Sequence, residues 1–151
     1  MAKPSTQPLN DPATFQLFNE IGIIQQLVNT RFERALPDGL TASQFGVLNH
    51  FVRLGGERAP SDLARAFQVT KGAMTNTLSK LEAKGLIRIQ PSADDRRAKV
   101  VTITPQGRRM RERAIKAAST AMADVTEFVS DDAAALLEPL RRIREYLDTH
   151  R

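Results

Sequence analysis

The sequence predicts a mainly helical fold that contains one small β-hairpin. Two observations carry this prediction. Apolar residues recur at spacings of three and four along most of the chain, and these spacings place side chains on one face of a helix. Between residues 86 and 104, apolar and polar residues alternate in two short runs, which is the pattern of half-buried strands.

The chain begins with a polar segment and then a predicted helix. Residues 1–11 are polar, with two prolines and no apolar run, so we expect a flexible tail without a secretory signal. The first helix is predicted over residues 12–35. Its apolar residues form one stripe: Leu17, Ile21, Ile24 and Val28. Pro37 and Gly39 then break the helix.

Two shorter helices are predicted next. Thr41 and Gln44 have the spacing of a capping box, which opens the second helix. The glycine pair at 55–56 ends it, because glycine readily adopts the backbone conformation that follows a helix. Pro60 suits the first turn of a third helix. The apolar residues of this third helix are Leu63, Ala64 and Phe67.

A fourth helix, predicted over residues 70–84, has two distinct faces. The inward positions are apolar: Met74, Leu78 and Leu81. The outward positions carry short polar or basic side chains: Thr70, Lys71, Thr75, Asn76, Ser79 and Lys80. Such a face can enter the major groove of DNA, where Asn pairs with adenine and Ser or Thr contacts any base. The alternative is an ordinary solvated helix surface.

The two alternating runs, LIRIQ and KVVTIT, predict a hairpin with a charged loop over residues 91–98. Arg96 and Arg97 lie at its tip beside Asp94 and Asp95. A carboxylate can orient a guanidinium through paired hydrogen bonds, and an oriented arginine can enter a narrow minor groove. We expect the nearby cations to contact phosphates: Arg65, Lys84, Arg88 and Lys99.

Two further helices complete the prediction. Thr104 is the expected N-cap of the first, with Pro105 at its first position and an apolar face over residues 110–128. Ser130 is the expected N-cap of the last helix. Pro139 lies inside it and lacks a backbone N–H, so we expect a kink there or a later start. Four helices, a hairpin and two helices in this order predict a winged helix-turn-helix.

The charge distribution points to an anionic partner. The net charge is +5, and residues 61–113 carry twelve Lys or Arg against five Asp or Glu, whereas the rest of the chain is slightly acidic. This local excess favours nucleic acid as the partner. Cysteine is absent, which excludes disulfides and thiolate metal sites. No apolar run is long enough to span a membrane, so we expect a cytoplasmic protein without a membrane partner.

The sequence offers little support for an enzyme. Asp94 and Asp95 are adjacent in a loop, which directs their carboxylates apart rather than across one substrate. No Ser/His/Asp set, phosphate-binding loop or metal-ligand spacing is present. We therefore expect no catalytic residue, no metal and no cofactor.

The residues of the hairpin resemble those of a known family. Asp95, Arg97 and Lys99 reproduce the D-x-R-x-K wing motif of the MarR family of winged-helix transcription regulators. The segment from Leu63 to Gly107 resembles the helix-turn-helix of that family and the start of its next helix. This resemblance implies a transcription regulator, expected to be a repressor, that binds double-stranded DNA.

The resemblance also implies an organisation. Residues 12–35 and 108–151 would form the helical dimerisation region of a homodimer, and residues 36–107 the DNA-binding lobe. The homodimer would read a palindromic operator with the helix at 70–84 in the major groove and the wing at 91–99 in the minor groove. Arg97 would be the wing arginine and Asp95 its orienting partner.

Many members of the family respond to a phenolic or other small anionic effector. The resemblance implies a pocket between the dimerisation helices and the DNA-binding lobe, and His50 is a candidate to line it. Two alternatives to an effector-controlled regulator remain open. One is a constitutive or architectural DNA-binding protein without an effector, and the other is a winged helix that only contacts proteins.

Overall fold

The structure is a computed structural model, and it describes residues 11–150. Six α-helices, a short 3₁₀ turn and one hairpin make up this part of the chain. In chain order they are α1 (Ala13–Ala35), η1 (Pro37–Gly39), α2 (Ala42–Leu54), α3 (Pro60–Ala66), α4 (Lys71–Ala83), β1 (Ile87–Pro91), β2 (Lys99–Ile103), α5 (Pro105–Ala121) and α6 (Ala123–Thr149). The predicted mainly helical fold with a small β-hairpin is confirmed.

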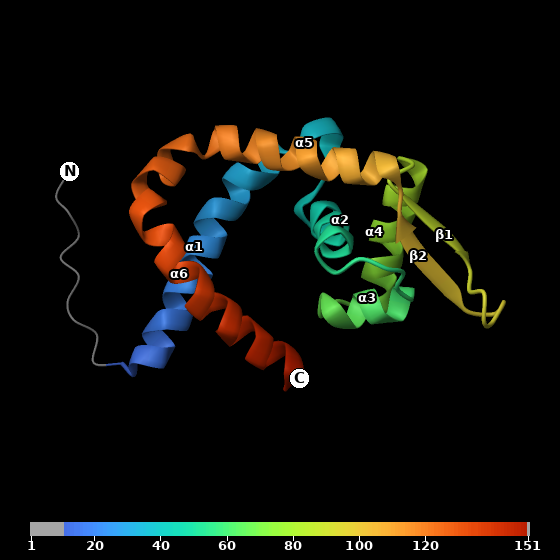
Figure 1. The fold of residues 1–151 in the computed structure, drawn as a ribbon, viewed down its shortest axis with the longest axis horizontal. Helices are drawn as coiled ribbons and strands as arrows, with labels where there is room; N and C mark the ends of the chain where they lie inside the picture. The colour runs from blue at the N-terminus through green and yellow to red at the C-terminus, as the bar shows by residue number, and fades with distance from the viewer. Residues whose placement is uncertain (1–10, 151) are drawn as a thin grey trace.

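The helices form an arch (Figure 1). Helix α5 runs along the top and connects its two sides. Helices α1 and α6 lie on one side, and we call them the arm. Helices α2, α3 and α4 lie with the hairpin on the other side, and we call this group the lobe. The predicted tail over residues 1–11 lies, apart from Asp11, outside the described residues.

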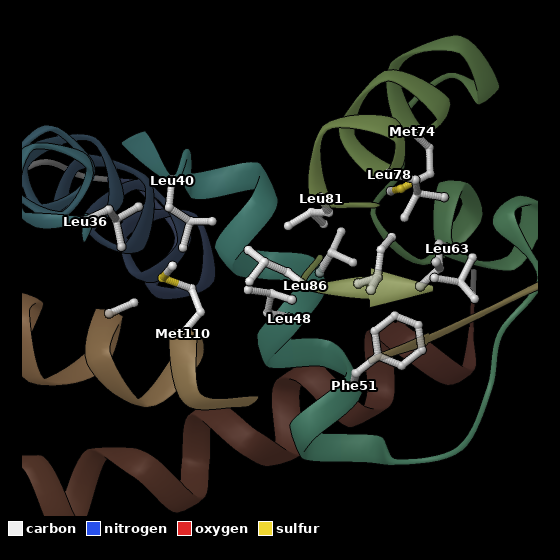
Figure 2. Packing of buried hydrophobic residues seen from close by; sticks show 14 of the residues in the cluster. Leu36, Leu40, Leu48, Phe51, Leu63, Met74, Leu78, Leu81, Leu86 and Met110 are labelled. Carbon is white, nitrogen blue, oxygen red and sulfur yellow. The ribbon is translucent and has the colours of Figure 1, made fainter. Parts of the chain in front are cut away.

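The hydrophobic core sits inside the lobe. Figure 2 shows Leu48 of α2 beside Leu86, and Phe51 of α2 near Leu63 of α3. All four side chains are fully buried. Helix α4 contributes the three apolar residues that its spacing predicts: Met74, Leu78 and Leu81. Their burial fixes the rotation of α4 about its axis, so the opposite face of α4 is left at the surface.

Threonine side chains cap the N-termini of α2, α4 and α5, and the capping box predicted at Thr41 is confirmed. The hydroxyl of Thr41 accepts a hydrogen bond from the Gln44 N–H at 3.2 Å, and the Gln44 side chain accepts one from the Thr41 N–H at 3.3 Å. Thr70 caps α4 by accepting from the Ala73 N–H at 3.1 Å. Each bond satisfies an N–H group that has no partner within the first turn of its helix.

The hairpin is antiparallel, with Ile87 opposite Ile103 and Ile89 opposite Val101. Ile87 and Val101 are buried, so one face of the hairpin packs on the lobe. On its other edge, Val101 exchanges two backbone hydrogen bonds with Arg58, at 2.8 and 3.1 Å. The segment before α3 therefore extends the hairpin by one short bridge and anchors it to the lobe.

Helix α5 begins directly against the base of the hairpin. Thr104 caps it by accepting from the Gly107 N–H at 3.0 Å, and the same hydroxyl donates to the Gly85 carbonyl at 2.7 Å. A Cβ atom at Gly107 would overlap the Leu86 carbonyl oxygen and crowd the Ile103 side chain. Only glycine therefore allows this close approach of α5 to the hairpin.

The start of the last helix differs from the prediction. Helix α5 ends at Ala121, and α6 begins at Ala123 and continues through Ser130 and Pro139. The predicted N-cap at Ser130, like the later start considered for Pro139, is wrong. The Ser130 hydroxyl donates to the Glu127 carbonyl at 3.0 Å within the helix, which gives the side chain a partner without a helix start.

The arm leaves large apolar side chains at the surface. Neither α1 nor α6 has a buried residue in this chain. Leu27 is 70% exposed and Phe128 is 87% exposed, and the predicted stripe on α1 is at most half-buried. Ala114 and Ala118 of α5 are buried, and α5 packs on both α1 and α2. The described helices include none that is long and apolar enough to cross a membrane.

Candidate nucleic-acid interface

The exposed face of α4 carries the polar residues that the sequence predicts. Lys71, Asn76, Ser79 and Lys80 are all exposed. Thr75 is exposed too, but its hydroxyl donates to the Lys71 carbonyl at 2.8 Å. The Thr75 hydroxyl can therefore accept a hydrogen bond from a partner, but its proton is already donated within the helix. Thr70 is also exposed, and its oxygen is engaged as the N-cap.

The loop of the hairpin is closed by a short network of hydrogen bonds. The carboxylate of Asp95 accepts from the Arg97 backbone N–H at 2.9 Å, and the Asp95 carbonyl accepts from the Ala98 N–H at 3.0 Å. The Ser92 N–H donates to the Ala98 carbonyl at 2.8 Å. These bonds fold residues 92–98 into a compact tip, because an aspartate can cap the amide two residues further along.

Asp95 thus orients the wing by a different route from the expected one. We predicted a carboxylate that holds the Arg97 guanidinium, whereas the structure gives that carboxylate to the Arg97 backbone. Over residues 11–150, no ion pair joins Asp94 or Asp95 to the guanidinium of Arg96 or Arg97. Both arginine side chains are exposed. They are held near one another by the backbone of the tip.

The exposed face of α4 and the wing meet in one groove of about 490 Å³. Thr75 and Ser79 of α4 line one side, and Arg96, Arg97 and Lys99 line the other. A neighbouring hollow of about 340 Å³ is lined by Lys71 and Thr75 together with Lys99. The structure therefore brings together residues of α4 and the wing that lie 17 to 28 positions apart in the sequence, and their net charge at this surface is positive.

Two of the four predicted phosphate contacts are engaged within the chain. Lys84 donates to the Asp38 backbone carbonyl at 3.0 Å. Arg65 pairs with Asp62 at 3.1 Å on the exposed surface of α3. Arg88 and Lys99 are exposed on the wing strands. The Lys84 bond ties the end of α4 to the turn after α1, a role that the charge of Lys84 alone does not reveal.

His50 lines a cavity of about 340 Å³ between α2, α3 and the end of α6. Its ring lies 5.5 Å from the Phe67 ring. Burial lowers the pKa of His50 below its ordinary value, and the charges of Arg53 and Arg58 lower the pKa further, against a smaller opposing effect of Asp148. The cavity is lined by Arg53, Leu54, Ala66, Phe67, Arg144 and Asp148 in addition to His50.

Glu82 is a charged residue of the groove that the sequence did not predict. It lies on α4, and its carboxylate accepts from the Ile89 backbone N–H at 2.8 Å. Nothing in the local sequence signals this bond, because it depends on how β1 crosses the end of α4. Across residues 11–150, no group of three His, Cys, Asp or Glu side chains could hold a metal ion.

A three-helix lobe with a hairpin, an exposed polar helix face and cationic residues on the wing defines the winged helix-turn-helix class of DNA-binding proteins. The profile of the MarR family matches residues 38–98. The multiple antibiotic resistance protein MarR of Salmonella typhimurium is 37% identical over 103 residues, which cover 63% of this chain and 71% of that protein. The chain belongs to the MarR family and is a DNA-binding transcription regulator.

Solved structures agree with this assignment. The transcriptional regulator BldR from Sulfolobus solfataricus has a TM-score of 0.70 and 32% sequence identity, and the match covers 88% of this chain and 95% of BldR. The apo form of MarR from E. coli has a TM-score of 0.70 and 27% identity, over 83% of this chain and 93% of that one. The resemblance found in the wing residues is confirmed at the level of the family and its fold.

Proposed function

We propose that this chain acts as a homodimeric repressor that reads a palindromic operator in double-stranded DNA. The observation that carries the proposal is the groove shared by α4 and the wing. A helix that enters the major groove and a wing that reaches the adjacent minor groove must face the same side of the molecule. Here the polar residues of α4 and the cations of the wing line the same groove.

The side chains suggest a division of roles. Asn76 and Ser79 are short and exposed on α4, and such groups read base edges in a major groove. Thr75 joins them as an acceptor. Lys71 and Lys80 suit phosphates, which fix the position of the protein on the duplex without selecting a sequence. Arg97, with Arg96 beside it, suits the negative potential of a narrow minor groove, and Lys99 suits its flanking phosphates.

We assign the arm, together with most of α5, to dimerisation. The assigned regions are residues 12–35 and 108–151, and residues 36–107 form the DNA-binding lobe. This division is supported by the many large apolar side chains that the arm exposes, because a monomer rarely leaves so much apolar surface in water unless it is an interface. Two-fold symmetry then places the two half-sites about one helical turn apart. Chromosomal DNA as the partner implies that the protein works in the cytoplasm.

The cavity beside His50 is our candidate effector site. Arg53 and Arg144 supply positive charge there, and Leu54 and Phe67 supply apolar contact. A small aromatic anion would pair with the positive charge and pack its ring against the apolar side chains. The cavity joins the end of the arm to the lobe, so an occupant that binds one spacing of these parts more tightly would shift the DNA-binding equilibrium. A constitutive DNA-binding protein is the alternative, and insensitivity of DNA binding to every such anion would favour it.

The oligomeric state tests the proposal. We expect the purified protein to sediment as a dimer, and selection from random duplexes to return a palindrome. Leu27→Asp should give a monomer that binds this palindrome weakly, because a charge would be buried in the arm interface. The matched control is Gln26→Asp at the adjacent exposed position. A monomeric wild-type protein that selects a single asymmetric site would contradict the proposal.

A further inference from the structure

Glu82 makes the hydrogen bond that joins the end of α4 to the wing. Its Oε1 atom accepts from the Ile89 backbone N–H at 2.8 Å. The direction of this N–H follows from the register. Val101 points both its N–H and its C=O toward Arg58, so the residue opposite Val101 points its own backbone groups away from β2. That residue is Ile89, and its N–H therefore faces the open edge of β1.

The open edge of β1 needs a partner from outside the sheet. The sheet has two strands among the described residues, and β1 has no strand neighbour on this side. An edge N–H is an unmet donor unless water or a side chain accepts from it. Glu82 supplies a charged acceptor, and hydrogen bonds to charged groups are stronger than neutral ones. The bond lies two residues before Pro91, where the charged loop begins.

The position of Glu82 would otherwise disfavour binding of DNA. Among the residues that line the 490 Å³ groove, Glu82 is the one acid, opposite Arg96 and Arg97. A carboxylate at a surface that receives phosphates opposes binding by repulsion. The hydrogen bond to Ile89 gives this acid a role that compensates for the repulsion, because it fixes where the wing stands relative to α4.

We infer that Glu82 is a positioning residue, which sets the angle between the wing and α4 so that both reach their grooves together. The inference rests on the proposed role of the wing in DNA binding. The base of the hairpin is held by the close packing of Gly107 on Leu86, but that contact lies at the opposite end of β1 from the tip. Glu82 holds the middle of the strand, closer to the tip, so it resists a pivoting of the wing about this base that would displace Arg97.

Two substitutions separate the hydrogen bond from the charge. Glu82→Gln removes the charge and keeps an oxygen that can accept from Ile89, whereas Glu82→Ala removes both. Loss of the charge alone should leave operator affinity unchanged or raise it in both variants. We therefore expect Glu82→Ala to bind the selected operator about five- to tenfold more weakly than Glu82→Gln, which corresponds to the loss of one positioning hydrogen bond.

Two readouts distinguish positioning from general stability. In an Arg97→Ala background, the difference between Glu82→Ala and Glu82→Gln should fall below about twofold, because the wing no longer contributes the contact being positioned. Amide exchange of the Ile89 N–H should accelerate in Glu82→Ala and stay near the wild-type rate in Glu82→Gln. The Val101 N–H donates to the Arg58 backbone carbonyl, so its protection from amide exchange should be unchanged in both variants.

Each contrary outcome has its own meaning. Equal affinities of Glu82→Ala and Glu82→Gln, while Arg97→Ala weakens binding, would overturn the inference and leave the proposed wing role intact. An undiminished difference in the Arg97→Ala background would also overturn it, since Glu82 would then act through α4. If Arg97→Ala alone has no effect on binding, the proposed wing role fails and the inference fails with it.

Discussion

The carboxylate of Asp95 accepts a hydrogen bond from the backbone N–H of Arg97 at 2.9 Å. This bond shapes the tip of the wing and leaves the Arg97 guanidinium outside the ion pairs of the described residues. Asp95, the acid of the D-x-R-x-K motif, therefore positions Arg97 by binding its backbone rather than its guanidinium. An arginine presented in this way can reach DNA without first breaking an internal ion pair.

Arg97→Ala should weaken operator binding by about 1–3 kcal/mol, because it removes a minor-groove contact. The fold should be unaffected, since the side chain is exposed. Fluorescence anisotropy with the selected operator measures the loss, and circular dichroism checks the fold. Glu57→Ala, at an exposed position of the lobe outside the groove, is the control and should bind at least as tightly as the wild type. Unchanged affinity of Arg97→Ala would remove the wing from the mechanism.

Asp95→Asn and Asp95→Ala should differ in DNA affinity. Asparagine keeps an oxygen that accepts from the Arg97 N–H and caps the same turn, whereas alanine does not. We expect near wild-type binding for Asp95→Asn and a loss of about 1 kcal/mol for Asp95→Ala. The same anisotropy titration checks both. A loss of equal size in Asp95→Asn would indicate that the carboxylate charge acts on the guanidinium after all.

Lys80→Ala should weaken binding to all duplexes by a similar factor. Lys80 is exposed on α4 and is proposed to contact a phosphate, which carries no sequence information. The slope of log affinity against log salt should become shallower by about one unit, because one fewer counterion is released. Titrations at several salt concentrations measure this slope. A loss confined to one base-pair position would instead make Lys80 a base-reading residue.

Gly107→Ala should lower the free energy of unfolding by about 1–3 kcal/mol, because a Cβ here overlaps backbone that cannot move aside easily. Chemical denaturation measures the change. Gly72→Ala is a matched control, since a Cβ at Gly72 meets nothing within 4 Å, and helix propensity favours alanine there. If the Gly107→Ala protein is as stable as the wild type, the close packing of α5 against the hairpin does not contribute to stability.

His50 should make stability depend on pH. Burial, Arg53 and Arg58 lower its pKa below the ordinary value of 6.5, so the unfolded chain binds a proton more readily than the folded protein. The contribution of His50 to the free energy of unfolding is therefore fully present above pH 6.5. It is lost as the pH falls toward the pKa that His50 has in the folded protein. We expect His50→Gln to show a smaller loss of stability over this window in thermal unfolding. Identical pH profiles would contradict the assigned shift.

Much of the fold follows from local signals in the sequence. Thr41, Thr70 and Thr104 each cap a helix through a bond to a residue three positions ahead, so a short window of sequence contains the whole cause. Ser130 shows the limit of such signals. Its residue type suits a helix start, but a hydrogen bond to Glu127 satisfies it inside α6.

The candidate site was predicted in its residues and less well in its contacts. The exposed face of α4 follows from helical spacing, because buried Met74 and Leu78 determine which side faces outward. The bonds of Glu82 to Ile89 and of Lys84 to Asp38 join elements that are brought together by tertiary packing. Their sequence contexts carry no pattern of charge or spacing that specifies these partners.

The most direct test of the account is the affinity of the purified protein for the DNA upstream of its own coding sequence. Fluorescence anisotropy should be measured at two salt concentrations, with random duplex as competitor. The account predicts tight binding that resists the competitor, with one dimer per site and a defined salt slope. Weak binding that is equal on all duplexes and falls steeply with salt would contradict it, because the basic surface would then attract DNA without reading a sequence.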